Sequence, residues 1–383
     1  MSIVGSEFRP SWWLCNPHVQ TVLASRLVRP PPPPVSHERL ELDDGDFIDL
    51  AHTLSSGPPL APGSIAPSAP PPATTADPGE VHGASHAGRE TLAADDGPRV
   101  LLLHGLAGSL DSAYARGAMR SLVARGFGVT LMHWRGCSGE PNRLARSYHS
   151  GESGDVARLV ALLRERHPRS PLYALGFSLG GNALLKYLGE RGEDTPLAAA
   201  LAVCPPLVLE VGATQLDRGI ARGYRNHLLG LMRAQHEAKR ARHPELDLPP
   251  AHAGLDSFWR FDDELTAPLH GFDGVEDYYA RCGARRFLGG IRRPTHILVA
   301  RDDPFFTEAI LPERHELAPG TLLELAEHGG HVGFLAGGRG WPPRRWLDER
   351  VADVLAGLHD VETRRRSGPG NDAIPSRTHL HIE

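Results

Sequence analysis

Cysteine is scarce in this chain of 383 residues. The sequence has four, and none lies in a CxxC pair: Cys15, Cys137, Cys204 and Cys282. Zinc sites and disulfide frameworks require closely spaced or paired cysteines, so this spacing argues against both, and we expect no bound metal. We therefore expect reduced thiols in a cytoplasmic protein.

Long apolar runs and large blocks of one charge are also missing. No run approaches eighteen apolar residues, which excludes a membrane-spanning helix, and the first residues do not have the pattern of a signal peptide. The formal net charge is only −5, and the one basic run, 364–366, lies in a polar tail. We expect no nucleic-acid partner. Peripheral contact with a membrane and the oligomeric state stay open.

Proline, by contrast, is abundant and unevenly placed. Eight prolines fall between Pro58 and Pro78, among Ala, Ser, Gly and Thr. This composition buries too little apolar surface to offset the entropy of ordering, so we expect a flexible insertion over 54–97. Residues 38–53 alternate apolar and polar around Asp44-Gly45, which predicts a β-hairpin within an N-terminal segment, 1–53.

Short apolar runs alternate with amphipathic stretches from residue 98 onward. The expected strands are 99–103, 128–133, 172–175, 198–204 and 295–300, and the expected helices are 112–125, 154–166 and 182–189. This alternation indicates an α/β fold with a mostly parallel central sheet flanked by helices. Strand signals stop after Pro205, so we expect a helical cap (205–291) between two core parts (98–204 and 292–360), with a disordered tail over 361–383.

One serine stands between glycines where an expected strand meets an expected helix. Gly176 to Gly180, GFSLG, matches the G-x-S-x-G nucleophile elbow, which is a weak signal alone. The strand before it and the helix after it strengthen the match, because small residues permit the strained turn that exposes Ser178. Ser109, Ser138 and Ser153 also have glycine neighbours but lack this frame. We predict that Ser178 is a nucleophile rather than a structural turn serine.

A serine hydroxyl needs a histidine base and a carboxylate that orients the histidine. The strand 295–300 ends in Asp302-Asp303-Pro304, and we predict Asp303 as the acid, with Asp302 as the alternative. The later loop EHGGHVGF contains His328 and His331. We predict His331 as the base, because it follows Gly-Gly and precedes an apolar segment, and His328 as a loop histidine.

An oxyanion hole needs backbone N–H groups aimed at the developing negative charge. The loop HGLAG at 104–108 follows the first parallel strand, so we predict the amides of Leu106 and Leu179 as donors. A phosphate-binding loop is the rival interpretation, but neither glycine-rich phosphate motif is present. Cys137 as a second nucleophile is disfavoured. The acidic run 262–264 indicates a solvated or salt-bridged face rather than a metal site.

Several longer motifs accompany these residues. They are NPHVQT (16–21), HGLAGSLDSAYARG (104–117), RGCSGEPNR (135–143), YHSGESGD (148–155), GFSLGGN (176–182), FDDELTAPLHGF (261–272), EDYY (276–279), RDDPF (301–305) and GGHVGF (329–334). Together they make the chain resemble the YheT-like hydrolases of the α/β-hydrolase superfamily over most of 8–355. The resemblance implies an esterase-like Ser/Asp/His site, which matches Ser178, Asp303 and His331.

These observations predict a serine hydrolase that cleaves carboxylic esters through an acyl-enzyme, without a cofactor. The same triad could serve an acyltransferase or a thioesterase, and a non-catalytic binding module of this fold is the alternative from another class. Aromatic residues of the expected cap suggest a small-molecule or lipid-like acyl ester as substrate, although the same residues would also pack a cap core.

Overall fold

The computed structural model describes residues 2–53, 96–252, 254–337 and 341–367. A nine-stranded sheet forms its centre, in the order β1-β9-β8-β7-β6-β4-β5-β3-β2. Its strands are β1 (Ile3–Gly5), β2 (Val35–Glu41), β3 (Phe47–Thr53), β4 (Arg99–Leu103), β5 (Gly128–Met132), β6 (Leu172–Phe177), β7 (Ala199–Val203), β8 (Thr295–Ala300) and β9 (Thr321–Ala326). All neighbours from β1 to β5 pair in parallel, whereas β3 pairs antiparallel with both β5 and β2.

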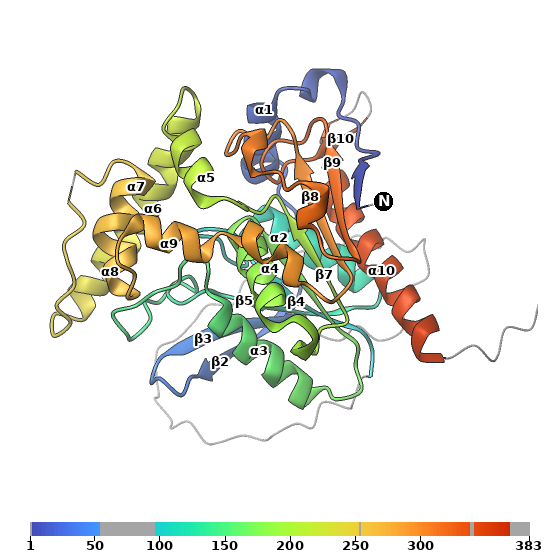
Figure 1. The fold of residues 1–383 in the computed structure, drawn as a ribbon, viewed down its shortest axis with the longest axis horizontal. Helices are drawn as coiled ribbons and strands as arrows, with labels where there is room; N and C mark the ends of the chain where they lie inside the picture. The colour runs from blue at the N-terminus through green and yellow to red at the C-terminus, as the bar shows by residue number, and fades with distance from the viewer. Residues whose placement is uncertain (1, 54–95, 253, 338–340, 368–383) are drawn as a thin grey trace, which may run out of the picture.

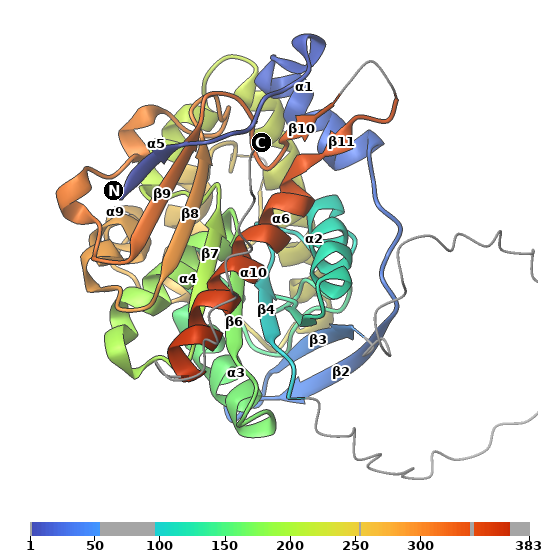
Figure 2. The same cartoon turned by 90° about the vertical axis from the view of Figure 1, so that its right-hand side faces the viewer.

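Helices cover both faces of this sheet, as the α/β pattern predicts (Figures 1 and 2). One face carries α2 (Ala113–Ala124) and α10 (Trp346–Ser367), and the other carries α3 (Ser153–Arg166) and α4 (Leu179–Arg191). Side chains alternate between the faces along β4: Val100 and Leu102 pack with the α2 and α10 side, and Leu101 and Leu103 with the α3 and α4 side. Two buried layers thus enclose the strands.

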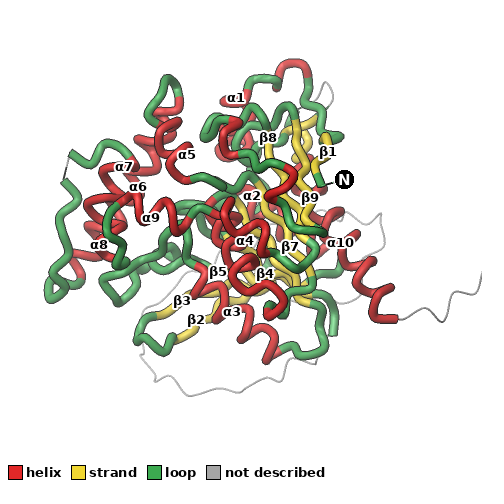
Figure 3. Tube along the Cα trace, viewed as in Figure 1, coloured by secondary structure: helices red, strands yellow, loops and turns green. Residues whose placement is uncertain are grey.

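The segment between β7 and β8 consists of helices joined by loops, with no strand among its described residues (Figure 3). It contains α5 (Leu209–Leu216), α6 (Ala221–Arg242), α7 (Phe258–Phe261), the π-helical η4 (Asp262–Thr266), α8 (Ala267–Leu269), α9 (Val275–Cys282) and the 3-10 helix η5 (Ala284–Gly290). The helices from α5 to α9 share an apolar core of their own, whereas Ala284 and Leu288 of η5 belong to the core layer that contains α4. Leu106 and Phe305, from loops after β4 and β8, pack against that core. The helices therefore lie over the carboxyl ends of the strands.

The N-terminal segment reaches both edges of the sheet. After β1 come η1 (Trp12–Leu14), α1 (Pro17–Val22) and the π-helical η2 (Leu23–Leu27), which lie near the small antiparallel pair β10 (Leu335–Ala336) and β11 (Arg344–Arg345). The hairpin of β2 and β3 then turns at Asp44-Gly45, where Gly45 has φ +83°. Short 3-10 turns complete the described elements: η3 (Gly192–Asp194), η6 (Glu308–Ile310) and η7 (Arg314–Glu316).

The predicted start of the disordered tail is wrong, and the predicted insertion lies almost entirely outside the described residues. Helix α10 continues to Ser367, so the tail predicted as disordered from residue 361 is helical over its first seven residues. Its last turn is stabilised by Arg365 and Arg366, which pair with Glu362. The insertion expected over 54–97 falls almost entirely outside the described residues. No helix in the described ranges is long and apolar enough to cross a membrane.

Candidate active site

Ser178 sits at a sharp turn between β6 and α4. Its backbone has φ 50° and ψ −120°, a conformation that L-residues rarely adopt. The turn is fixed on both sides, because the Ser178 N–H donates to the Val203 carbonyl (2.8 Å) and the Asn182 N–H donates to the Ser178 carbonyl (3.0 Å). These two hydrogen bonds therefore fix the strained backbone of Ser178, and in this conformation its hydroxyl projects out of the sheet.

The two glycines of the motif, Gly176 and Gly180, leave no room for a side chain. A Cβ on Gly176 would lie 2.5 Å from the Gly180 carbonyl oxygen, and one on Gly180 would lie 2.4 Å from the carbonyl oxygen of Leu103. Both distances are shorter than any real contact to a Cβ atom. The pattern G-x-S-x-G thus lets the start of α4 pack tightly on β6 and β4.

Three predicted residues come together at this turn. The Nε2 atom of His331 lies 3.0 Å from Oγ of Ser178, and its Nδ1 atom lies 2.8 Å from Oδ2 of Asp303. Asp303 is buried, and its other oxygen accepts the Phe305 N–H (2.9 Å). A carboxylate can only accept, so the proton of a neutral His331 sits on Nδ1 and leaves Nε2 free to accept from the serine hydroxyl.

The neighbouring aspartate has a different set of partners. Asp302 accepts the Gly330 N–H (3.0 Å) with one oxygen and contacts Nδ1 of His328 (3.1 Å) with the other. Burial raises the pKa of this carboxyl above its ordinary value. Asp302 therefore ties down the loop before His331, whereas Asp303 contacts the His331 ring itself.

The N-terminal motif NPHVQT also contacts the loop that contains His331. Oγ1 of Thr21 accepts the His331 N–H (2.9 Å) and donates to the Pro17 carbonyl (2.8 Å). The fully buried Gln20 donates to the carbonyls of Leu14 and Leu335 and accepts the Leu335 N–H. Sequence reasoning assigned no role to Gln20 or Thr21, although their motif was among those it singled out.

Aromatic rings enclose the imidazole of His331. Phe305 stacks on it in parallel, with centroids 3.9 Å apart, and Phe306 meets it edge-on at 5.5 Å. Tyr224, from α6, packs on Phe305 at 5.1 Å. These contacts fix the ring plane and exclude water from one of its faces, so the ring can swing little away from Ser178.

The predicted oxyanion donors are two backbone amides without an acceptor among the described residues: those of Leu106 and Leu179. The amides beside Leu106 are used, since Gly105 donates to the Tyr114 hydroxyl and Ala107 to the Tyr148 hydroxyl, both at 2.8 Å. Leu179 is the first residue of α4, where the helix end favours negative charge.

A cavity of about 100 Å³ extends from Leu106 and Leu179 beneath the helices between β7 and β8. Its walls combine apolar and polar side chains: Met232, Phe258, Phe261, Leu265 and Leu269 on one hand, and His149, Gln235, His236, Asp262, His270 and Tyr278 on the other. Leu106 and Leu179, whose amides are the predicted oxyanion donors, thus line this cavity, whereas Ser178 and His331 are not among its lining residues.

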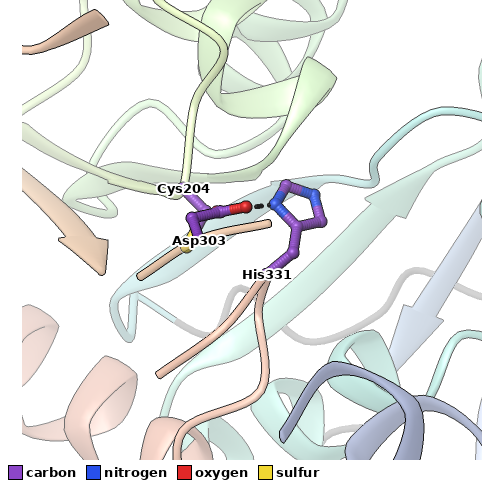
Figure 4. Close-up of side chains that lie close together, drawn as sticks. All are labelled: Cys204, Asp303 and His331. Atoms are coloured by element: carbon purple, nitrogen blue, oxygen red, sulfur yellow. Dashed lines mark hydrogen bonds and ion pairs between the residues drawn. The ribbon is translucent and has the colours of Figure 1, made fainter. Parts of the chain in front are cut away.

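Cys204 lies close to Asp303 and His331, and one ligand atom from each falls within 4.8 Å of the others (Figure 4). Burial, and then the charge of Asp303, raise the pKa of this thiol well above its ordinary value. A protonated thiol is a poor metal ligand, and Nδ1 of His331 already donates to Asp303. The cluster does not suit a metal ion.

Cys137 and the acidic run 262–264 have structural surroundings rather than the features of a second nucleophile or a metal site. Burial raises the pKa of Cys137 to about 12, which keeps it a thiol and a weak nucleophile. The acidic run points to three different sets of partners: Asp262 accepts from Thr266 and Tyr279, Asp263 accepts the Val275 N–H, and Glu264 pairs with His252 and Arg260.

The fold and this constellation define a class of protein. A family model described as the alpha/beta hydrolase fold matches residues 98–337, which is more than half of the chain. The chain belongs to the α/β-hydrolase superfamily, as its sequence motifs indicate.

Comparison with individual relatives places the chain more closely within this superfamily. The protein named "Putative esterase YheT" of Escherichia coli is 38% identical over 353 residues, which make up 91% of this chain and 93% of the relative. The chain is accordingly a YheT-like hydrolase, and the resemblance seen in its sequence is confirmed. Monoacylglycerol lipase of Saccharomyces cerevisiae is 29% identical over 71% of this chain, and phospholipase ABHD3 of Mus musculus is 30% identical over 66%. The match spans 62% of each of these two relatives.

Proposed function

We propose that this protein is a serine hydrolase that cleaves carboxylic esters. Ser178 is the nucleophile, His331 the general base and acid, Asp303 the residue that orients His331, and the amides of Leu106 and Leu179 form the oxyanion hole. The observation that carries the proposal is the continuous hydrogen-bonded chain from Ser178 through His331 to Asp303, built on a strained elbow. The relatives named as an esterase and as lipases support the choice of an ester bond.

Catalysis runs in two halves. Oγ of Ser178 attacks the ester carbonyl while Nε2 of His331 takes its proton, and the negative charge that develops on the carbonyl oxygen is held by the two free amides. His331 then returns the proton to the departing alcohol, which leaves an acyl group on Ser178. A water molecule, deprotonated by His331, attacks this acyl-enzyme, and His331 returns the proton to Oγ of Ser178 as the acyl–oxygen bond breaks and the carboxylic acid leaves. Asp303 stabilises the imidazolium in both halves.

The substrate that fits best is an ester with a mainly apolar acyl group. The cavity is lined by Leu106 and Leu179, whose amides are the proposed oxyanion donors, and by apolar side chains such as Met232, Phe258 and Leu265. A lipid-like ester agrees with this lining and with the names of the relatives. The same triad can catalyse hydrolysis, thioester cleavage and acyl transfer. Acyl transfer differs from hydrolysis in the acceptor of the acyl group, and thioester cleavage differs in the bond that is broken.

The test is steady-state hydrolysis of p-nitrophenyl esters of increasing acyl length. Ser178→Ala should lower kcat by several powers of ten, and Ser138→Ala, another serine beside glycine, should retain it. Undiminished hydrolysis by purified Ser178→Ala would refute the assignment. Release of free acid with water as the only acceptor separates hydrolysis from acyl transfer, and a matched thioester tests the remaining alternative.

A further inference from the structure

Exposed large apolar side chains are concentrated in one region of the molecule. Nine large ones are exposed in the described ranges, and six of them lie in η1, α1, η2 or the turn before α6: Trp12, Trp13, Val19, Val22, Leu27 and Ile220. Trp12 is 86% exposed and Ile220 is 70% exposed. Scattered single residues would need no explanation, but a group of this kind marks an interaction surface. We call residues 12–27 and 217–227 the rim surface.

The two segments of the rim surface are joined. Nδ1 of His18 lies 3.1 Å from the Tyr224 hydroxyl, and Nη2 of Arg26 lies 2.9 Å from Nε2 of His227. In two perpendicular views that share a vertical axis, the helices around α1 and the turn between α5 and α6 both stand at the top edge (Figures 1 and 2). Both segments therefore project in the same direction, so one flat partner can touch them together.

The rim surface adjoins the candidate active site. Thr21 accepts the His331 N–H, and Tyr224 packs on Phe305, which in turn stacks on His331. A partner that covers this surface therefore lies beside Ser178 rather than on a remote face.

Its charge is positive. Residues 12–27 contain Arg26 and no Asp or Glu. In residues 217–227, Arg218, Arg222 and Arg225 stand against one acid, Asp217, which Arg225 already pairs. Exposed tryptophan and aliphatic side chains beside arginines suit the boundary between lipid headgroups and acyl chains, where the apolar groups insert and the cations meet anionic headgroups.

We propose that the rim surface seats the protein on an anionic lipid bilayer, with the active site at the lipid boundary. This inference rests on the proposed function and extends it: the natural substrate is an ester held in a lipid aggregate. Trp12 and Ile220, from the two segments, insert into the interface, and Arg218 and Arg222 contact the headgroups.

The test is cosedimentation of the full chain with vesicles of equal parts phosphatidylcholine and phosphatidylglycerol, and with vesicles of phosphatidylcholine alone. The wild-type protein should bind the anionic vesicles more strongly. The double variant Trp12→Ser/Ile220→Ser should bind them at least about tenfold more weakly, since losing two inserted side chains removes at least that much affinity. Val361→Ser is the matched control, because Val361 is 62% exposed but lies in the last turns of α10, away from the rim surface.

Hydrolysis of soluble p-nitrophenyl acetate, measured in parallel, separates this inference from the proposed function. The double variant should retain that activity while losing vesicle binding. Equal vesicle binding by the double variant and the wild-type protein would overturn the docking proposal. So would a wild-type protein that ignores vesicles but self-associates through Trp12 and Ile220, because the surface would then be a contact between copies. A protein that binds vesicles but hydrolyses no ester would leave docking intact and refute the proposed function.

Discussion

At the scale of single residues, two adjacent aspartates have separate partners. The side chain of Asp303 meets Nδ1 of His331, and that of Asp302 meets Gly330 and His328. Sequence reasoning ranked Asp303 first because a residue before proline is pushed towards extended backbone and held in one direction. It could not supply the partners of Asp302, because those depend on how the 328–331 loop folds back on β8.

This separation predicts unequal effects of two similar substitutions. Asp303→Asn should favour the wrong imidazole tautomer and lower kcat by on the order of 10⁴, the size of the effect that the equivalent change has in serine proteases. Asp302→Asn keeps an oxygen that can accept the Gly330 N–H, so it should retain most of the activity. Measuring kcat of both variants on one short-chain ester decides, and the reverse ranking would move the acid to Asp302.

At the scale of elements, helix α1 acts as a support for the histidine loop. The side chains of Gln20 and Thr21 replace the regular pairing that this loop lacks. Sequence reasoning located most sheet strands, because their apolar runs are plain, but it missed the short β1 and also β9. Strand β9 contains Glu324, a buried acid that bonds Ser6, His296 and Arg350 and interrupts the apolar pattern.

The contact between Thr21 of α1 and the His331 loop predicts that Thr21 affects catalysis although it does not touch the substrate. Thr21→Val removes the acceptor of the His331 N–H and should lower kcat by roughly ten- to a hundredfold through misplacement of the ring, with little change in KM. Thr21→Ser keeps the hydroxyl and should keep kcat. Steady-state kinetics and a thermal melt of both variants check this. A Thr21→Val enzyme with wild-type kcat, or a Thr21→Ser enzyme as slow as it, would contradict the positioning role.

Element η4 predicts a pH dependence of stability. Burial raises the pKa of Asp262 to about 6, although Thr266 and Tyr279 donate hydrogen bonds to it. Between about pH 4 and pH 6 the folded protein keeps a proton that the unfolded chain has released, so the free energy of unfolding falls as the pH rises through this window. The loss amounts to about 3 kcal/mol.

Asp262→Asn should lack this fall. Urea unfolding of both proteins from about pH 4 to pH 7 should therefore show that the free energy of unfolding of the variant rises relative to that of the wild-type protein as the pH rises. The same slope in both proteins would show that Asp262 ionises in the folded state as easily as in the unfolded chain.

At the scale of the whole molecule, the class of fold follows from the order of strands and helices, whereas the assembly of the site does not. The sheet brings the ends of β4, β6 and β8 to one edge, and with them Leu106, Ser178 and Asp303. The N-terminal contacts to His331 join residues more than 300 positions apart, such as Thr21 and His331. No local pattern in the sequence encodes such a contact.

The chain should tolerate loss of the proline-rich insertion. Thr53 contacts Val129 and Arg99 pairs with Gly128, so the two ends lie on either side of β5, two strand spacings or about 10 Å apart. Replacing residues 56–92 by a short Gly/Ser linker should leave kcat/KM and the melting temperature nearly unchanged. A large fall in either would show that the segment contributes to the core or to the site.

The central claim is that Ser178 forms a covalent intermediate with the help of His331. The most direct measurement is peptide mapping by mass spectrometry after reaction with a fluorophosphonate, which labels an activated serine. We predict one adduct, on the peptide that contains Ser178, which disappears in Ser178→Ala and forms far more slowly in His331→Ala. An adduct on another serine, or no adduct in a protein that still hydrolyses esters, would contradict it.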